Sequence, residues 1–140
     1  MTATSIGNSA RGACLCGSVT FVARFPTKWV AHCHCTMCQR EHGAAFVTWV
    51  SVPGEQFQLV DPHRVLKTYS SSPGAERKFC GRCGSSLVFQ SEHWPGEVHV
   101  ARASFVDPLD REPAIHGYYD THVEWFAVND DLPRKAEPRA

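Results

Sequence analysis

The chain has 140 residues, and its 14 Lys and Arg residues balance its 14 Asp and Glu residues, which gives a formal net charge of zero. This length suits one domain that buries roughly 70% of its unfolded surface on folding. Without a net positive charge, the chain lacks the basic field that would hold a nucleic-acid backbone or an anionic membrane surface. We therefore expect neither nucleic acid nor a membrane among its partners.

The amino-terminal segment indicates the cellular compartment in which the protein is expected. Residues 1–12 hold one arginine and no apolar run, and no later stretch reaches the apolar length of a membrane span. We therefore expect a cytoplasmic protein. In a reducing cytosol, patterned cysteines are more often metal ligands or catalysts than disulfides. The odd number of cysteines, seven, agrees with that interpretation because they cannot all pair with one another.

Alternating apolar and polar side chains predict short β-strands along most of the chain. In chain order the predicted strands are Val19–Arg24, Trp29–Cys33, Phe46–Val52, Phe57–Val60, Val65–Tyr69, Leu87–Gln90, Val98–Ala103 and Val123–Val128. Proline and glycine residues between them predict turns. One short helix is expected at Thr36–His42, with Thr36 as its cap. The sequence thus predicts a single, mainly β domain over residues 11–133, with flexible ends at 1–10 and 134–140.

The cysteines fall into three groups along the chain. These groups are Cys14 with Cys16, then Cys33, Cys35 and Cys38, and then Cys80 with Cys83. The last pair is a Cys-x-x-Cys followed by glycine, a pattern that turns the chain tightly and points both sulfurs inward. It supplies two ligands and needs two more, and the first pair is the natural complement. Together they would form a closed, tetrahedral zinc site of the structural kind.

The middle group places three cysteines within six residues, so it could hold a metal ion by itself. Three protein ligands leave the fourth position open, as in a catalytic zinc site. Spacing alone leaves alternatives, because Cys38 could join the Cys-x-x-Cys pair, or His32 or His42 could close the second site. Three thiolates on a divalent zinc leave one negative charge, and such an ion suits thiol chemistry better than hydrolysis.

Other polar residues near the cysteines are weaker candidates. Arg40 follows the triplet by two residues and could hold an anionic substrate. His32 and His34 alternate with the cysteines, so we expect their rings to face away from the metal and to support it from behind. The remaining histidines singled out, His63, His93 and His99, are expected in turns or on strand faces without a catalytic role.

Several short motifs follow one another along the chain in a characteristic order. They are Cys14-x-Cys16-Gly17-x-Val19, Cys33-His34-Cys35-x-x-Cys38-Gln39-Arg40 with Gly43-Ala44-Ala45-Phe46 after it, Phe79-Cys80-x-x-Cys83-Gly84-Ser85, Ala103-Ser104-Phe105-Val106-Asp107-Pro108, Pro113 to His116, Trp125-Phe126 and Asp131-Leu132-Pro133. This order resembles the glutathione-dependent formaldehyde-activating enzyme family, which includes centromere protein V. The resemblance spans roughly residues 11–133.

The resemblance implies a β-tent fold, in which antiparallel sheets meet around a structural zinc. It implies two zinc ions per chain: a structural ion at Cys14, Cys16, Cys80 and Cys83, and a catalytic ion at Cys33, Cys35 and Cys38. The activity it implies is condensation of formaldehyde with glutathione to S-(hydroxymethyl)glutathione. We therefore expect a zinc-dependent carbon–sulfur lyase that acts on adducts of a small, glutathione-like thiol with an aldehyde such as formaldehyde. The alternative is a non-enzymatic zinc-binding module for a small molecule or a protein partner.

Overall fold

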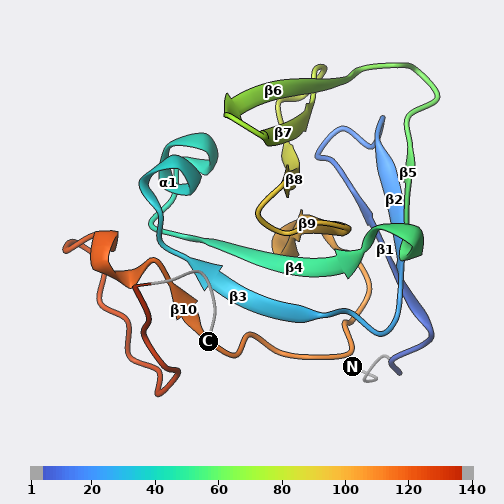
Figure 1. Cartoon of the computed structure of the whole chain (residues 1–140). Helices are drawn as coiled ribbons and strands as arrows, with labels where there is room; N and C mark the ends of the chain where they lie inside the picture. The colour runs from blue at the N-terminus through green and yellow to red at the C-terminus, as the bar shows by residue number, and fades with distance from the viewer. Residues whose placement is uncertain (1–4, 137–140) are drawn as a thin grey trace.

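The structure is a computed structural model, and it describes residues 5–136 as two β-sheets with one α-helix and short 3-10 turns. The smaller sheet has three strands in the order β1-β2-β5. They span Ser9–Ala13 (β1), Thr20–Arg24 (β2) and Phe57–Val60 (β5). Figure 1 shows this sheet at one side of the molecule, where β1 and β2 lie beside β5. The chain is thus mainly β, as predicted.

The larger sheet has seven strands in the order β10-β3-β4-β9-β8-β7-β6. Their bounds are His116–Gly117 (β10), Trp29–Cys33 (β3), Val47–Pro53 (β4), Glu97–Ala101 (β9), Ser86–Ser91 (β8), Ala75–Cys80 (β7) and Leu66–Ser72 (β6). Neighbouring strands pair antiparallel, except that β10 runs parallel to β3. The helix α1, Thr36–His42, follows β3 directly, and three 3-10 turns cover Gly54–Gln56, Arg102–Ser104 and Tyr119–Thr121.

The hydrophobic core lies where the two sheets meet. Phe21 of the small sheet is 1% exposed and packs edge-on against Phe105, with ring centroids 5.0 Å apart. Val50 and Val100, on neighbouring strands of the large sheet, are fully buried in the same cluster. Gly12 permits this packing, because a Cβ atom there would lie 2.0 Å from the Phe21 ring. Burial of a Phe or Val side chain stabilises a fold by about 1.5–3 kcal/mol.

Seven predicted strands overlap β2 to β6, β8 and β9, and the predicted helix coincides with α1. The strand predicted at Val123–Val128 is wrong, because this segment forms bends without strand pairing. Its apolar side chains are not core residues, since Trp125 is 75% exposed and Phe126 is 48% exposed. Strands β1, β7 and β10 were missed: small and charged residues conceal the alternation of β1 and β7, and β10 has only two residues.

The predicted flexible ends also need correction. Ser9 and Ala10 belong to β1, and Ala10 is fully buried, so the ordered domain begins before residue 11. At the other end, the Lys135 amide donates a 2.8 Å hydrogen bond to the His116 carbonyl. Residues 1–4 and 137–140 lie outside the described part of the chain. Among residues 5–136, no helix has the length and apolar character needed to cross a membrane.

Candidate metal centres and the cavity on the large sheet

The first and third cysteine groups meet in space. Cys14 and Cys16 follow β1, whereas Cys80 ends β7 and Cys83 lies in the turn that leads to β8. Their four sulfur atoms lie within 4.8 Å of one another, with 3.6 Å between Cys14 and Cys16 and 3.8 Å between Cys16 and Cys80. Two sulfurs bound to one tetrahedral zinc ion are about 3.8 Å apart. This donor set therefore fits a closed zinc site.

Backbone groups hold these sulfurs in place. The amide of Val19 donates to the Cys14 sulfur at 3.3 Å, and the amide of Arg82 donates to the Cys80 sulfur at 3.4 Å. Gly84 adopts a positive φ of 82°, in the left-handed region that favours glycine. Because β1 belongs to the small sheet and β7 to the large one, this group of cysteines joins the two sheets.

The middle group forms a second cluster at the junction of β3 and α1. The sulfurs of Cys33, Cys35 and Cys38 lie within 4.8 Å of one another, with 3.5 Å between those of Cys33 and Cys38. Cys35 is the N-cap of α1, and its sulfur accepts a 3.3 Å hydrogen bond from the Cys38 amide. The cap predicted at Thr36 is therefore wrong by one residue. Because Cys35 caps the helix and Cys38 lies in its first turn, the helix itself positions two of the three sulfurs.

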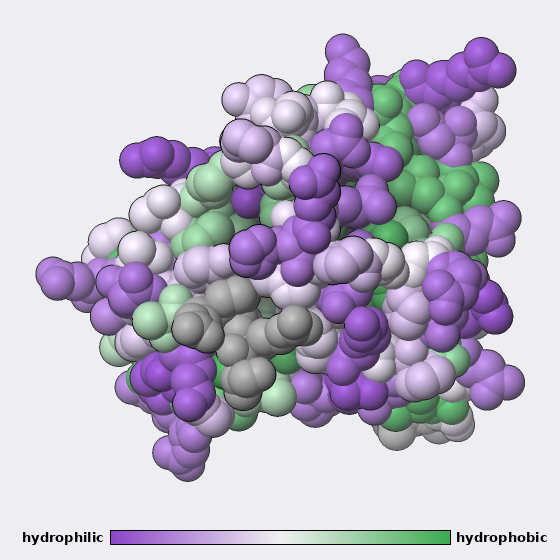
Figure 2. Space-filling view, in the orientation of Figure 1, coloured by the Kyte–Doolittle hydropathy of each residue, from purple (hydrophilic) through white to green (hydrophobic). Residues whose placement is uncertain are grey.

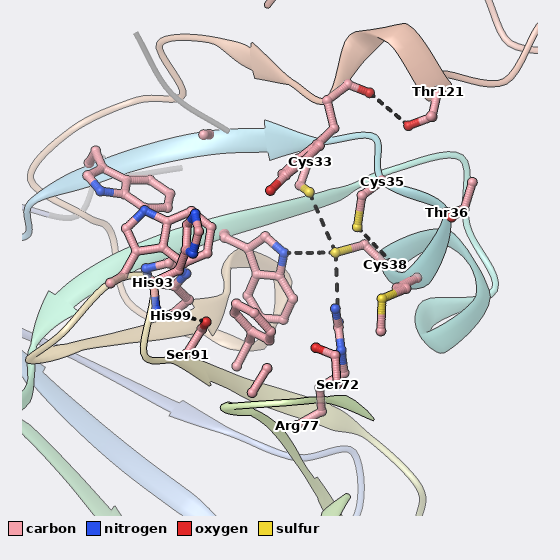
Figure 3. Close-up of a pocket in the computed structure, with 18 of the residues that line it drawn as sticks. Cys33, Cys35, Thr36, Cys38, Ser72, Arg77, Ser91, His93, His99 and Thr121 are labelled. Atoms are coloured by element: carbon pink, nitrogen blue, oxygen red, sulfur yellow. Dashed lines mark hydrogen bonds between the residues drawn. The ribbon is translucent and has the colours of Figure 1, made fainter. Parts of the chain in front are cut away.

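Side chains from the large sheet also reach the Cys38 sulfur (Figure 3). Trp49 of β4 donates its indole N–H at 3.4 Å, and Arg77 of β7 donates from its guanidinium at 3.7 Å. The same Arg77 nitrogen donates to the Glu41 carboxylate at 2.6 Å, and Arg77 is 6% exposed. Donors of this kind stabilise a thiolate relative to a thiol.

The three thiols of this cluster differ in pKa. Hydrogen bonds from Cys33 and Cys38 lower the pKa of Cys35 to about 2. Contact with Cys35 and Cys38, together with burial, raises the pKa of Cys33 well above its ordinary value. One thiolate thus forms readily, and its negative charge opposes the ionisation of its neighbours. A divalent cation would remove that opposition, so the donor set fits a metal with three thiolate ligands.

The cysteine triplet forms one wall of a cavity of about 440 Å³. Its other walls are largely aromatic and come from Trp29, Trp49, Phe89, Trp94 and His99, with Tyr118 and Thr121 near the triplet. Trp29 and Trp94 pack edge-on against the His99 ring, with centroid distances of 4.6 and 5.1 Å. A mainly apolar cavity with a few polar groups is typical of a small-molecule site.

Sequence reasoning missed a polar network that lies behind one wall of this cavity. His99 is 3% exposed, and its Nε2 lies 3.0 Å from the Glu97 carboxylate. Glu97 also accepts hydrogen bonds from Lys28 at 2.9 Å and from Ser51 at 2.8 Å. A signal was available, because β9 alternates these two residues with the apolar Val98 and Val100. Strand alternation therefore places Glu97 and His99 on the face opposite the core.

The other residues considered from the sequence are divided between the cavity and other parts of the molecule. Arg40 is exposed and lies in a separate surface depression, so it does not join the triplet. His93 and His63 both lie in turns, as expected, and His93 also lines the cavity. His34 is 1% exposed and forms a hydrogen bond with His116.

A two-sheet β fold with a closed group of four cysteines and an open group of three defines a protein with two candidate metal centres. The profile of the family described as glutathione-dependent formaldehyde-activating enzyme matches residues 9–121. The chain belongs to this family.

Known relatives agree with this membership. A Halomonas elongata protein, provisionally named a glutathione-dependent formaldehyde-activating enzyme, is 29% identical over 127 residues, which are 84% of this chain and 79% of that protein. An uncharacterized lyase of Schizosaccharomyces pombe is 31% identical over 83 residues, or 56% of this chain and 55% of that protein. A crystal structure of a Rhodobacter sphaeroides protein shares the fold, with a TM-score of 0.58 and 21% identity, over 89% of this chain and 98% of that one.

Proposed function

We propose that this chain is a zinc-dependent carbon–sulfur lyase that forms or cleaves the bond between a small thiol and a small aldehyde. Glutathione and formaldehyde are the first candidates, because the family and the Halomonas relative are named for them. The observation that carries the proposal is the position of the Cys33, Cys35 and Cys38 sulfurs at the wall of an apolar cavity. A metal-binding group that faces a substrate-sized space favours catalysis over a purely structural role.

The two cysteine clusters have different proposed roles. Cys14, Cys16, Cys80 and Cys83 would hold a structural zinc ion, since four sulfurs complete its coordination. Cys33, Cys35 and Cys38 would hold the catalytic zinc ion. When bound there, zinc would keep an incoming thiol ionised at neutral pH, although a free thiol has a pKa near 8.5.

The chain's own residues would set the surroundings of that sulfur. Trp49 and Arg77 fix the Cys38 sulfur through their hydrogen bonds, so the cluster keeps its orientation toward the cavity. The aromatic walls would exclude water and hold the carbonyl compound beside the thiol. Positioning of two reactants in this way lowers the entropic part of the barrier.

The reaction needs one bond change and one proton. The thiolate sulfur attacks the carbonyl carbon, a carbon–sulfur bond forms, and the carbonyl π electrons move to the oxygen, which then takes a proton. The reverse direction returns the proton and breaks the same bond. We assign the proton exchange to His99, because it lines the cavity and its ring contacts the Glu97 carboxylate. An adjacent carboxylate stabilises the protonated imidazole.

The test must allow for the uncatalysed reaction, because thiols add to formaldehyde without an enzyme. We would measure the exchange rate between free formaldehyde and its thiol adduct at equilibrium by NMR. Zinc-loaded protein should accelerate exchange, and the Cys35→Ser variant should not. A wild-type protein that never exceeds the variant, with glutathione and with other small thiols, would exclude the lyase function and favour the binding module.

A further inference from the structure

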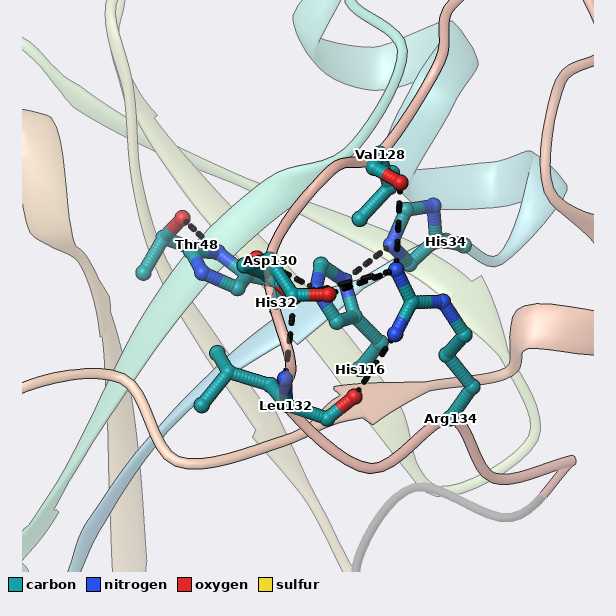
Figure 4. A network of polar contacts seen from close by, with 8 residues as sticks. All are labelled: His32, His34, Thr48, His116, Val128, Asp130, Leu132 and Arg134. Carbon is teal, nitrogen blue, oxygen red and sulfur yellow. Dashed lines mark hydrogen bonds and ion pairs between the residues drawn. The ribbon is translucent and has the colours of Figure 1, made fainter.

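A third group of potential metal ligands lies at the edge of the large sheet, where β10 pairs with β3. His32 and His116 are direct partners across this parallel pair, and Asp130 lies on the segment that follows β10 (Figure 4). One nitrogen of each histidine and a carboxylate oxygen of Asp130 lie within 4.8 Å of one another. The reaction proposed above uses none of these residues.

We propose that His32, His116 and Asp130 form a third metal site, suited to a divalent transition ion such as zinc. Imidazole nitrogen and carboxylate oxygen are common zinc ligands, and two histidines with one carboxylate form a known catalytic donor set. The site differs in chemistry from the cysteine clusters, because it contains no sulfur, although His32 immediately precedes Cys33.

On each ring, Nδ1 is engaged outside the proposed site, and the Nε2 of His116 contacts the Asp130 carboxylate, the third member of the site. The Nδ1 of His32 lies 2.7 Å from the Thr48 hydroxyl, and the Nδ1 of His116 lies 2.8 Å from Nε2 of His34. Metal-binding histidines commonly use their second nitrogen in this way, which fixes the ring orientation. Both Nε2 atoms can therefore serve as metal ligands, provided that the His116 ring carries its proton on Nδ1.

The spacing between His116 and Asp130 requires only small movements. Two ligand atoms bound to one tetrahedral zinc ion at 2.0–2.1 Å lie about 3.4 Å apart. The His116 Nε2 is 2.9 and 3.0 Å from the two Asp130 oxygens, so these atoms would move apart slightly to admit an ion. His116 is 1% exposed, whereas the Asp130 side chain is 42% exposed, which gives an ion access from one side.

Arg134 is a cation beside this group, and its charge opposes metal binding. Its guanidinium is 3.8 Å from the Asp130 carboxylate, but it donates shorter bonds of 2.8–3.1 Å to the carbonyls of Leu132, Val128 and Asp130. Arg134 is thus held mainly by backbone oxygens. The Asp130 carboxylate can therefore bind a metal ion while Arg134 keeps its shortest hydrogen bonds.

A metal at this site would have a structural consequence for the cavity. It would tie the segment carrying Asp130 to β3, which also carries Cys33. The chain between His116 and Asp130 includes Tyr118 and Thr121, which line the cavity. An ion here would therefore hold one wall of the cavity against the sheet without touching a substrate.

Cobalt titration of the metal-free full chain tests the proposal. Cobalt bound to thiolates absorbs strongly in the near ultraviolet, whereas cobalt bound only to nitrogen and oxygen does not. We expect cobalt ions that bind the cysteine clusters to produce the near-ultraviolet signal. One further cobalt ion per chain should then add visible absorption without increasing the near-ultraviolet signal. The third site is thereby detected independently of any catalytic activity and of the roles given to the cysteines.

Two conservative variants identify the ligands. Asp130→Asn keeps an acceptor for the Leu132 amide but loses the negative charge, and His32→Asn keeps a donor for Thr48 but loses Nε2. Each should weaken the additional ion's binding about ten-fold or more. Asp131→Asn is the matched control, since it removes a neighbouring exposed carboxylate. His116 is left unchanged because it is buried.

The outcomes divide clearly. An additional ion that is lost in both variants and retained in the control supports the site. The proposal is overturned if the wild type binds no cobalt ion other than those that give the near-ultraviolet thiolate signal. It is also overturned if both variants keep the additional ion, or if the control loses it equally. In those cases the three residues are only part of a hydrogen-bonded cluster with His34.

Discussion

Trp49 donates its indole N–H to the sulfur of Cys38 over 3.4 Å. Trp49 lies on β4, which pairs with the strand that carries Cys33, so the register of the sheet places the donor beside the cysteine cluster. Once a metal ion holds Cys38 as a thiolate, a hydrogen bond to this charged acceptor would contribute about 1.5–3 kcal/mol, more than a neutral one. The contact therefore links the ionisation of one sulfur to the geometry of the large sheet.

Trp49→Phe should weaken metal binding at the cysteine triplet about ten-fold, because phenylalanine keeps much of the packing but has no donor. Zinc affinity can be measured by competition with a chelator. Trp94→Phe is the matched control, since Trp94 lines the same cavity and no sulfur contact is found for its indole among the described residues. Equal losses in the two variants would show that cavity packing, rather than the hydrogen bond, governs affinity.

The two cysteine clusters should respond differently to the loss of one ligand. Cys80 is fully buried in the core, and a closed metal site contributes folding free energy. Cys80→Ser should therefore lower the melting temperature sharply or prevent soluble expression. Cys35→Ser should leave a folded chain that binds less metal. Thermal melting with metal analysis compares them, and the proposed roles fail if both variants melt alike and lose the same metal.

Much of the fold could be predicted because local alternation and turn residues act over short distances. Trp29–Cys33 and Phe57–Val60 were predicted with the bounds that the structure gives them. Val123–Val128 misled the prediction, because apolar composition alone does not supply a neighbouring strand with which to pair. In β7, Arg77 is buried, and one of its guanidinium nitrogens donates hydrogen bonds to Glu41 and Cys38. Such compensation across distant parts of the chain cannot be predicted from periodicity.

The cysteine clusters could be foreseen because tight Cys-x-Cys and Cys-x-x-Cys spacings constrain sulfurs locally. The cavity could not, because its walls come from β3, β4, β8 and β9 and form only when the sheet assembles. His99 illustrates the difference, since its neighbours Trp29 and Trp94 are brought to it by strand pairing and by a turn. The His32–His116 pair depends likewise on a parallel register between β3 and β10.

Arg40 should have no part in substrate binding, contrary to the hypothesis drawn from its position after Cys38. Its side chain is exposed outside the cavity, whereas Arg77 reaches the Cys38 sulfur. Arg40→Ala should leave kcat and KM for the thiol within about two-fold of wild type, and Arg77→Gln should lower kcat/KM about ten-fold or more. Steady-state kinetics with a verified substrate decides between them. A raised KM in Arg40→Ala alone would restore the original hypothesis.

Glu97 should make the protein sensitive to acid. Burial alone would raise its pKa, but hydrogen bonds from His99, Lys28 and Ser51 outweigh burial and lower the pKa from 4.5 to about 2. A carboxylate with a depressed pKa in the folded state contributes stability above its unfolded pKa, and that contribution disappears as the pH falls through the folded value. The stabilisation is therefore complete above about pH 4.5 and is lost between pH 4.5 and 2.

Glu97→Gln should be less stable than the wild type near neutral pH, and this difference should narrow as the pH falls from about 4.5 toward 2. Urea unfolding at a series of pH values measures the free energy of unfolding of both proteins. Glu92→Gln is the matched control, because Glu92 is an exposed carboxylate near the same end of the sheet. Its stability should follow the wild type throughout. A difference between Glu97→Gln and wild type that stays constant across this range would show that the ionised carboxylate does not stabilise the fold, and would leave only the loss of packing around His99.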